Sequence, residues 1–257
     1  MLSRLTDKPY RLIGGAALIG LWQTASVFMS DITMASPVEA FGAAWRMICD
    51  PVFLKEHLSI SIMRTVLALM LGSLCGFFLG VLAGRFEPVM DFLEPSRRLM
   101  TSIPAVVATV LAMLWFGMGS VMVIVLSTVF IVPTVYVNIA ESMVKCDKTY
   151  TEMAFVYRFS SLMRLKYIYL PAVYAALTAS LVVTTGNSMR LVILAEVMGA
   201  GEGLGYVLGI SRARLDMPTL YGCVLISFGF VWLGENIIRK ILRRRTGWKK
   251  TSANSAA

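Results

Sequence analysis

The sequence predicts an all-α polytopic membrane protein with six transmembrane helices. Of its 257 residues, 57% are hydrophobic and only 15% are charged, whereas a soluble domain of this size carries about 25% charged residues. The apolar residues also form runs close to the roughly 20 residues that a helix needs to cross a bilayer. The six expected spans are residues 12–29, 60–84, 103–118, 121–140, 172–197 and 220–238.

The first span is expected to be an uncleaved anchor. Arg4, Lys8 and Arg11 precede it, which fits both an anchor and a signal peptide. Its apolar run is longer than the roughly 7–15 residues of a signal-peptide core, and no clear small-residue cleavage site follows it. We therefore expect the first span to remain part of the folded protein.

The second span carries a regular stripe of glycine. Gly72, Gly76, Gly80 and Gly84 recur at every fourth position, so they lie on one face of a helix. Small residues at this spacing let a neighbouring helix approach closely. The stripe favours close helix packing, and a role in helix movement is the alternative.

The third span is short and has Pro104 near its beginning. A proline removes a backbone donor and breaks or kinks a helix. Backbone groups freed in this way must be satisfied by neighbouring helices. We expect a tilted or partly broken helix in a buried position.

Basic residues predict the orientation of the chain. With the N-terminus inside, 18 of the 24 Lys and Arg residues fall in cytoplasmic segments and four fall outside, which is the bias of a cytoplasmic N- and C-terminus. The net charge of +9 then faces the anionic inner leaflet, and no nucleic-acid partner is expected. The expected parts are a cytoplasmic N-terminus (1–11), a six-helix domain (12–238) and a basic cytoplasmic tail (239–257).

Neither a metal site, nor a cofactor, nor an enzymatic activity is expected. The four cysteines have no paired spacing and there is a single histidine, His57, so a zinc or disulfide framework is improbable. The sequence has no HExxH or GxSxG motif, and it has no phosphate-binding GxxxxGK[ST] loop. If ATP drives this protein, another chain must hydrolyse it.

The largest expected cytoplasmic loop spans residues 141–171. Apolar residues recur in it at helical spacings of three and four, which indicates short amphipathic helices. Such helices need a protein groove or the lipid headgroups to cover their apolar face. Pro171 suits the first turn of the next span. A loop that merely connects two spans is the alternative.

This loop resembles the "EAA…G…I-LP" loop of permease subunits of ATP-binding-cassette (ABC) importers. The matching positions are Glu152, Ala154, Ile168, Leu170 and Pro171. The resemblance implies the type I ABC importer permease fold, in which residues 149–171 form coupling helices that dock into cytoplasmic ATPase subunits. It places Glu152 and Ala154 at that contact.

Three further positions of the loop complete the resemblance or depart from it. Tyr157 lies beside the implied contact, Met153 replaces the usual second alanine, and Arg158 stands where the family has glycine. Glycine permits a positive φ angle that arginine adopts poorly. The turn at residue 158, or its fit to the ATPase, is the point on which this loop differs from the family.

Two other stretches resemble the nitrate/sulfonate/taurine-type permeases of this family. Residues 102–104 with 114–119 match their "SIP…LWFGIG" stretch, and residues 195–200 with 203–206 match their "AEMIGA…GLGY" stretch. The resemblance implies a second permease copy (a homodimer), an extracytoplasmic substrate-binding protein and a bacterial inner-membrane location. Pro104 and Trp115 are candidate pathway residues within these stretches.

Arg190 is the candidate substrate residue of the fifth span. Asn187, Ser188 and Arg190 lie close together in a segment poor in other charge, and an ionisable residue within a membrane is often functional. The guanidinium fork could receive a small anion such as a sulfonate, taurine or nitrate. Alternatively, Arg190 pairs with Glu196, which we also count as a candidate pathway residue, or extends toward the outer interface.

Three expectations remain open at this level. Arg64 near the outer end of the second span is expected to pack or to extend to the interface. The outer segment 199–218 is either a gate or docking surface, or an ordered loop. The same permease could serve a pyrimidine or vitamin precursor, and an ion-coupled secondary transporter or channel is the alternative from another class.

Overall fold

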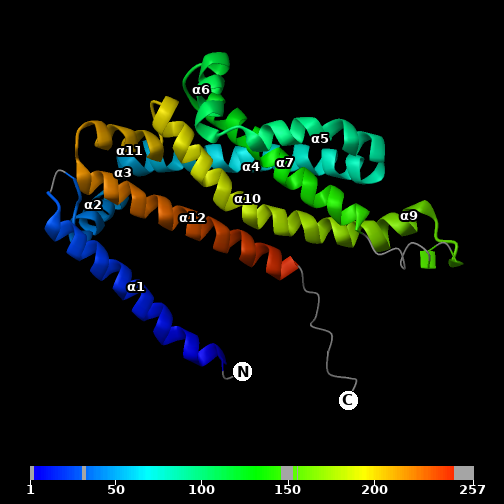
Figure 1. Ribbon diagram of the computed structural model, residues 1–257, viewed down its shortest axis with the longest axis horizontal. Coiled ribbons are helices and arrows are strands. Elements are labelled where there is room, and N and C mark those ends of the chain that lie inside the picture. The colour runs from blue at the N-terminus through cyan, green and yellow to red at the C-terminus, as the bar shows by residue number, and fades with distance from the viewer. Residues whose placement is uncertain (1–2, 31–32, 146–152, 155, 246–257) are drawn as a thin grey trace.

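The computed structural model describes residues 3–30, 33–145, 153–154 and 156–245. Throughout these residues the chain forms helices, turns and loops (Figure 1). The longest helices are α1 (Ser3–Phe28), α4 (Ser59–Arg85), α7 (Ser120–Val144), α10 (Leu170–Gly199) and α12 (Met217–Arg245). The shorter elements are α2 (Pro37–Cys49), α3 (Pro51–Phe53), η1 (Leu54–Leu58), α5 (Glu87–Ser102), α6 (Ala105–Phe116), α9 (Ser161–Arg164), η2 (Leu165–Tyr169) and α11 (Leu204–Ala213).

Four of these helical stretches are long and apolar enough to cross a membrane. They are Pro51–Arg85, Ser120–Val144, Tyr167–Gly199 and Met217–Ile241, and they confirm the second, fourth, fifth and sixth expected spans. The second and fifth begin earlier than predicted because η1 and η2 continue directly into α4 and α10. Six spans are not confirmed: the described residues hold four, or five if one bent helix pair counts as a span.

The third expected span, 103–118, is the one that differs most. Its helix α6 has only 12 residues, and it follows α5 at a bend of 102°. The helix break lies at Ile103 and Pro104. Gly117, the C-cap residue of α6, has a φ angle of 71°, and Gly119, the N-cap residue of α7, has a φ angle of 131°. Glycine adopts such angles readily, so hydropathy alone overestimated the length of this helix. The expected break at Pro104 is present, whereas the expected buried position is wrong, because Leu114 and Trp115 of α6 are 80% and 70% exposed.

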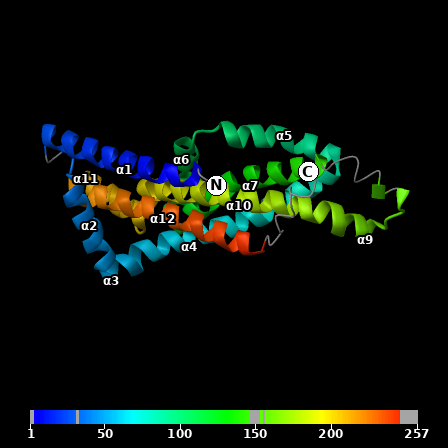
Figure 2. The ribbon, with the colours of Figure 1, turned by 90° about the horizontal axis from the view of Figure 1, so that it is seen from below.

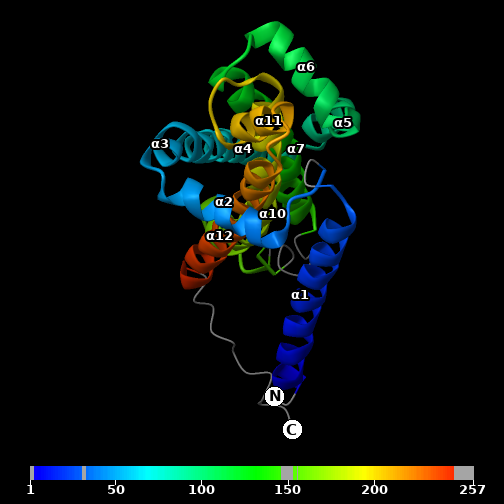
Figure 3. The same ribbon diagram turned by 90° about the vertical axis from the view of Figure 1, so that its left-hand side faces the viewer.

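The first expected span, 12–29, lies in α1, whose apolar part Ile13–Phe28 is shorter than the four candidate spans. Figures 1 and 3 show α1 standing apart from the other helices. The C-terminal part of α1 is attached to the rest of the chain through Trp22. Its Nε1 donates to the Ala35 carbonyl at 3.1 Å, and its ring lies 5.7 Å from that of Tyr221.

The glycine stripe of α4 packs directly on α7. A Cβ atom at Gly76 would lie 2.7 Å from Val135 Cβ and 2.9 Å from the Val132 carbonyl oxygen, closer than packed atoms approach. Gly72, Gly80 and Gly84 contact α7 in the same way. The close-packing interpretation is confirmed, and α4 with α7 forms the tightest pair of the bundle.

α10 and α12 run side by side through the middle of the molecule (Figure 2). They also meet at glycines: a Cβ at Gly234 of α12 would overlap Met189, and one at Gly186 of α10 would overlap Glu235. At the left end of Figure 1, α2, α3 and α11 cap the bundle, while α9 lies at the opposite end. The beginning of α1 and the end of α12 point toward the α9 end.

The glycine stripe generates a stability prediction. Gly76→Ala is expected to lower the midpoint of thermal unfolding in detergent by several degrees, because the added methyl group must push α4 away from Val135. Gly229→Ala in α12 is the matched control, since a Cβ there meets no atom within 4 Å. Equal unfolding temperatures for the two variants would show that α4 and α7 are not closely packed.

Candidate functional site

A partly polar cavity of about 370 Å³ lies between α7, α10 and the break that joins α5 to α6. The hydroxyl and amide side chains on it come from three different elements. Thr184 and Asn187 are three residues apart on α10 and share a face. The polar residues lining the cavity are Thr101, Thr134, Thr184, Asn187 and Arg190.

Arg190 provides the positive charge of this cavity. Its Nη1 donates to Asn187 Oδ1 at 3.2 Å, and its side chain is exposed on the single chain. No ion pair involving Arg190 occurs among the described residues. The guanidinium carries five N–H groups, so most of its donors remain free to bind an anion.

The alternative pairing of Arg190 with Glu196 is wrong in this structure, because Glu196 binds a different arginine. Arg64 Nη1 donates to Glu196 Oε1 at 2.7 Å, with side-chain exposures of 2% and 0%. The expectation that Arg64 extends to the interface is therefore also wrong. A fully buried charge is tolerated when it is paired and hydrogen-bonded, and both conditions hold here.

Further hydrogen bonds complete this buried charge network. Arg64 donates through Nη2 to Ser120 Oγ at 2.8 Å and through Nη1 to the Glu202 carbonyl at 2.8 Å. Glu196 accepts from Ser61 Oγ at 2.7 Å and from the Gly205 amide at 3.0 Å. The network thus joins α4, the start of α7, the end of α10 and the start of α11.

Two glycines make room for the network. A Cβ at Gly203 would overlap the carboxylate of Glu196, and one at Gly205 would lie 2.6 Å from Glu196 Cβ. Gly203 has φ 109°, and its amide donates to His57 Nδ1 at 3.3 Å. Within the segment 199–218 a short loop leads into α11, and Glu196 holds the start of that helix against the spans.

The remaining candidate pathway residues lie in different places. Pro104 is the N-cap residue of α6, between the cavity-lining residues Thr101 and Ala105. Ser188 is buried, and its hydroxyl donates to the Thr184 carbonyl within α10. The cavity thus brings Asn187 and Arg190 together with Thr101 and Ala105, which flank Pro104 in the sequence, while Ser188 and Glu196 face elsewhere.

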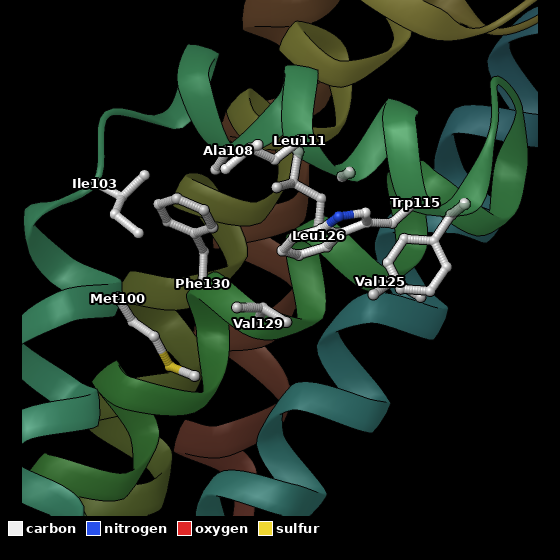
Figure 4. Close-up of a pocket in the computed structure, with 11 residues that line it drawn as sticks. Met100, Ile103, Ala108, Leu111, Trp115, Val125, Leu126, Val129 and Phe130 are labelled. Carbon is white, nitrogen blue, oxygen red and sulfur yellow. The ribbon is translucent and has the colours of Figure 1, made fainter.

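Trp115 lines a second, almost wholly apolar cavity of about 160 Å³ beneath α6. Figure 4 shows the side chains that surround it, contributed by α6, by α7 and by the end of α5. Met100 and Phe130 line both this cavity and the polar one. The polar cavity therefore has an apolar neighbour on its α6 side.

Sequence reasoning missed Thr101 and Thr134. These residues lie on α5 and α7, far in sequence from Arg190, and each is an ordinary helical threonine. Only the bend between α5 and α6 brings Thr101 onto the cavity, and no local sequence signal encodes that contact.

Met153 and Ala154 of the predicted coupling loop lie in a short helical segment, while Glu152 lies outside the described residues. Ala154 is completely buried, whereas Met153 and Tyr157 are 45% and 70% exposed. The segment thus presents an apolar surface to its surroundings.

Arg158 ends this segment in the left-handed conformation, with φ 50°. The Phe159 amide donates to the Ala154 carbonyl at 2.8 Å, which is the six-residue hydrogen bond of a Schellman helix cap. Glycine normally occupies this position. Arg158 therefore adopts the left-handed conformation that glycine normally takes at such a cap.

Ile168 and Leu170 lie in the helix that leads into α10. α9, η2 and α10 follow one another without a break from Ser161 to Gly199. Pro171 has no N–H for the Tyr167 carbonyl, which favours the wider π-helical turn just before it. The loop is thereby joined to α10 by continuous helix.

The fold and the broken apolar helices define a membrane permease, and the comparisons identify its family. The family model described as "Binding-protein-dependent transport system inner membrane component" matches residues 68–247. The chain belongs to this family: it is a multi-pass membrane protein and a permease component of an ABC importer, without catalytic activity of its own. Membership implies ATPase and binding-protein partners and excludes the ion-coupled carrier or channel considered above.

The relatives whose names state a substrate are distant in sequence. The chain is 26% identical over 92% of its length to the "Putative aliphatic sulfonates transport permease protein SsuC" of Bacillus subtilis, covering 86% of that protein. It is 24% identical over 91% of its length to the "Taurine transport system permease protein TauC" of Escherichia coli, covering 87% of it.

Among solved structures, the chain is similar to a chain of the MetNI methionine ABC transporter in an inward-facing conformation. The TM-score is 0.59 at 17% sequence identity, and the match covers 73% of this chain and 93% of the other. At this identity the likeness shows the fold alone.

The buried charge network generates a second stability prediction. Glu196→Gln or Arg64→Gln is expected to destabilise the protein by about 3–5 kcal/mol, because each leaves a buried charge without its partner. The double variant is expected to cost clearly less than the sum of the two. Thermal or denaturant unfolding in detergent gives these values, and additive costs would show that the two charges do not interact.

Proposed function

We propose that this chain forms, with a second copy of itself, the translocation pathway for a small anion in an ATP-driven importer. The observation that carries the proposal is the cation Arg190 on a polar cavity, with most of its N–H groups free. An arginine fork suits the planar or tetrahedral oxygens of a sulfonate or nitrate. The relatives named for aliphatic sulfonates and taurine support the same class of solute.

A homodimer fits the position of this cavity. In the single chain Asn187 and Arg190 are exposed, so one copy alone leaves the pathway open on one side. A charge exposed to lipid is costly. A second copy facing this side of α10 would close the pathway and place two such arginines along it.

The segment from Met153 to Arg158 is the proposed coupling element for the ATPase. Met153, Val156 and Tyr157 are exposed on it, whereas Ala154 anchors it to the protein. An exposed apolar helical surface outside the spans suits a groove in a partner protein. The continuous helix from Ser161 to Gly199, which begins shortly after this segment, would carry a movement of the ATPase to the residues of the cavity.

The proposed orientation places the α9 end of the molecule in the cytoplasm. The start of α1 and the end of α12 point to that end (Figure 1), so both termini would be cytoplasmic. Arg85, Lys145 and Arg164 also belong to the helix ends and loops on this side, next to the anionic leaflet. The opposite end, with α2 and α11, would face the substrate-binding protein outside the bacterial inner membrane.

Replacing the cavity cation tests the anion pathway. Arg190→Gln is expected to lower substrate uptake at least tenfold, because it removes the charge and the fork that hold the anion. Cellular uptake of a sulfonate and substrate-stimulated ATPase activity measure the effect. Arg46→Gln, on the exposed face of α2, is the control, and uptake by Arg190→Gln equal to that control would refute the anion contact.

The helix cap at Arg158 provides a test of coupling. Arg158→Gly is expected to preserve transport, since glycine adopts the left-handed conformation freely. Arg158→Val is expected to lower transport several-fold, because a β-branched residue strongly disfavours this conformation. Both variants lose the charge, so equal transport by the two would mean that the cap geometry does not matter for coupling.

A further inference from the structure

Glu235 of α12 lies next to the cavity cation. The point that a Cβ of Gly186 would occupy overlaps Glu235 Oε1 and is 3.5 Å from Arg190 Nη1. Only a glycine at residue 186 leaves room for the carboxylate to reach this position. The carboxylate and the guanidinium thus approach the same spot on α10 from different helices.

These two opposite charges do not bind each other. The ion pair that Glu235 makes among the described residues is with Arg239, one turn further along α12, with Oε2 3.7 Å from Arg239 Nη2. Within the described chain Oε1 accepts no hydrogen bond, and Arg190 bonds only to Asn187. A carboxylate can accept several hydrogen bonds, so both groups keep unused capacity.

The position of Glu235 and Arg190 within membrane-spanning helices makes these two charges, which do not bind each other, energetically costly unless a ligand binds to them. Glu235 lies within the candidate span Met217–Ile241, and its side chain is 30% exposed. Ionisable residues in a membrane are expensive and ordinarily pair with one another or line a pathway. A cation and an anion that are close, half-satisfied and accessible together suit a ligand that carries both charges.

We propose that Glu235 is a specificity-determining residue of the pathway and that the transported solute is a zwitterion. Arg190 and Asn187 receive the acidic group, and Glu235 Oε1 receives the ammonium group of the same molecule. The solute lies across the two side chains with its dipole opposed to theirs. An amine and an acid separated by one or two carbons fit this placement.

This inference rests on the proposed function, because it uses Arg190 as the anion contact. It adds that a simple anion binds less well than an amino acid or amino sulfonate of the same size. Gly186 is required for this arrangement of Glu235 and Arg190, since any side chain at residue 186 displaces the carboxylate from the arginine.

Direct binding to the permease, isolated with its ATPase subunits in lipid nanodiscs, tests the proposal. The probes are 2-aminoethanesulfonate and 2-hydroxyethanesulfonate, which differ only in the ammonium group, and their dissociation constants are measured by NMR titration. The protein is expected to bind the amino sulfonate at least tenfold more tightly. Glu235→Gln is expected to abolish this preference while changing the affinity of the hydroxy sulfonate less than threefold.

Two further variants keep the result interpretable. Glu235→Asp retains the charge but shortens the side chain, so it is expected to weaken the preference even if Glu235→Gln fails to fold. Arg239→Gln removes the other neighbour of Glu235, and it is expected to keep the preference.

The outcomes separate this inference from the proposed function. If Glu235→Gln strengthens the binding of both sulfonates equally, Glu235 is only a competing counter-charge and the inference is wrong. It is equally wrong if the unaltered protein shows no preference. If Arg190→Gln leaves the binding of both probes unchanged, the anion site of the proposed function is wrong instead.

Discussion

The buried ion pair between Arg64 and Glu196 is the interaction on which the rest of the structure depends. Two charges with exposures of 2% and 0% are stable only when every polar atom of the pair finds a partner. Ser61, Ser120 and the Gly205 amide supply those partners. Because they come from different helices, this requirement fixes the relative positions of α4, α7, α10 and α11 at one end of the bundle.

The same pair also decides the state of Arg190. Glu196 lies on the same helix as Arg190 and could neutralise it, but the carboxylate is already enclosed by Arg64, Ser61 and α11. The charge of Arg190 at the cavity is therefore not neutralised by Glu196, and Asn187 is the one hydrogen-bonding partner of Arg190 in the described residues. In physical terms, the structure uses one arginine to hold helices together and leaves the other accessible to a solute.

Much of the fold could be predicted from the sequence, and the failures have physical causes. Hydropathy located four spans because long apolar runs have few other stable placements. Residues 103–118 contain the break predicted at Pro104, but hydropathy overestimated the length of the helix because Gly117 also ends it within a run that remains apolar. It also could not show that Arg64 meets Glu196, 132 residues later in the chain, because that contact depends on helix packing. Arg190 with Asn187 was predictable because the two are one helical turn apart.

The continuity of one helix connects these separate features. From Ser161 to Gly199 the chain remains helical through α9, η2 and α10, so Ile168, Arg190 and Glu196 lie on one continuous helix, which begins three residues after Arg158. This helix is held at its C-terminal end by the Arg64 pair, and further toward its middle it meets α12 closely, through Gly186 against Glu235 and Met189 against Gly234. A displacement of the proposed coupling segment would reach this helix through residues 158–160 and would tilt or rotate it about these contacts. The cavity lies between α7, α10 and the α5–α6 break, and Arg190 on its lining is close to the Gly186 contact with α12. The shape of the cavity is the property that such a tilt would change.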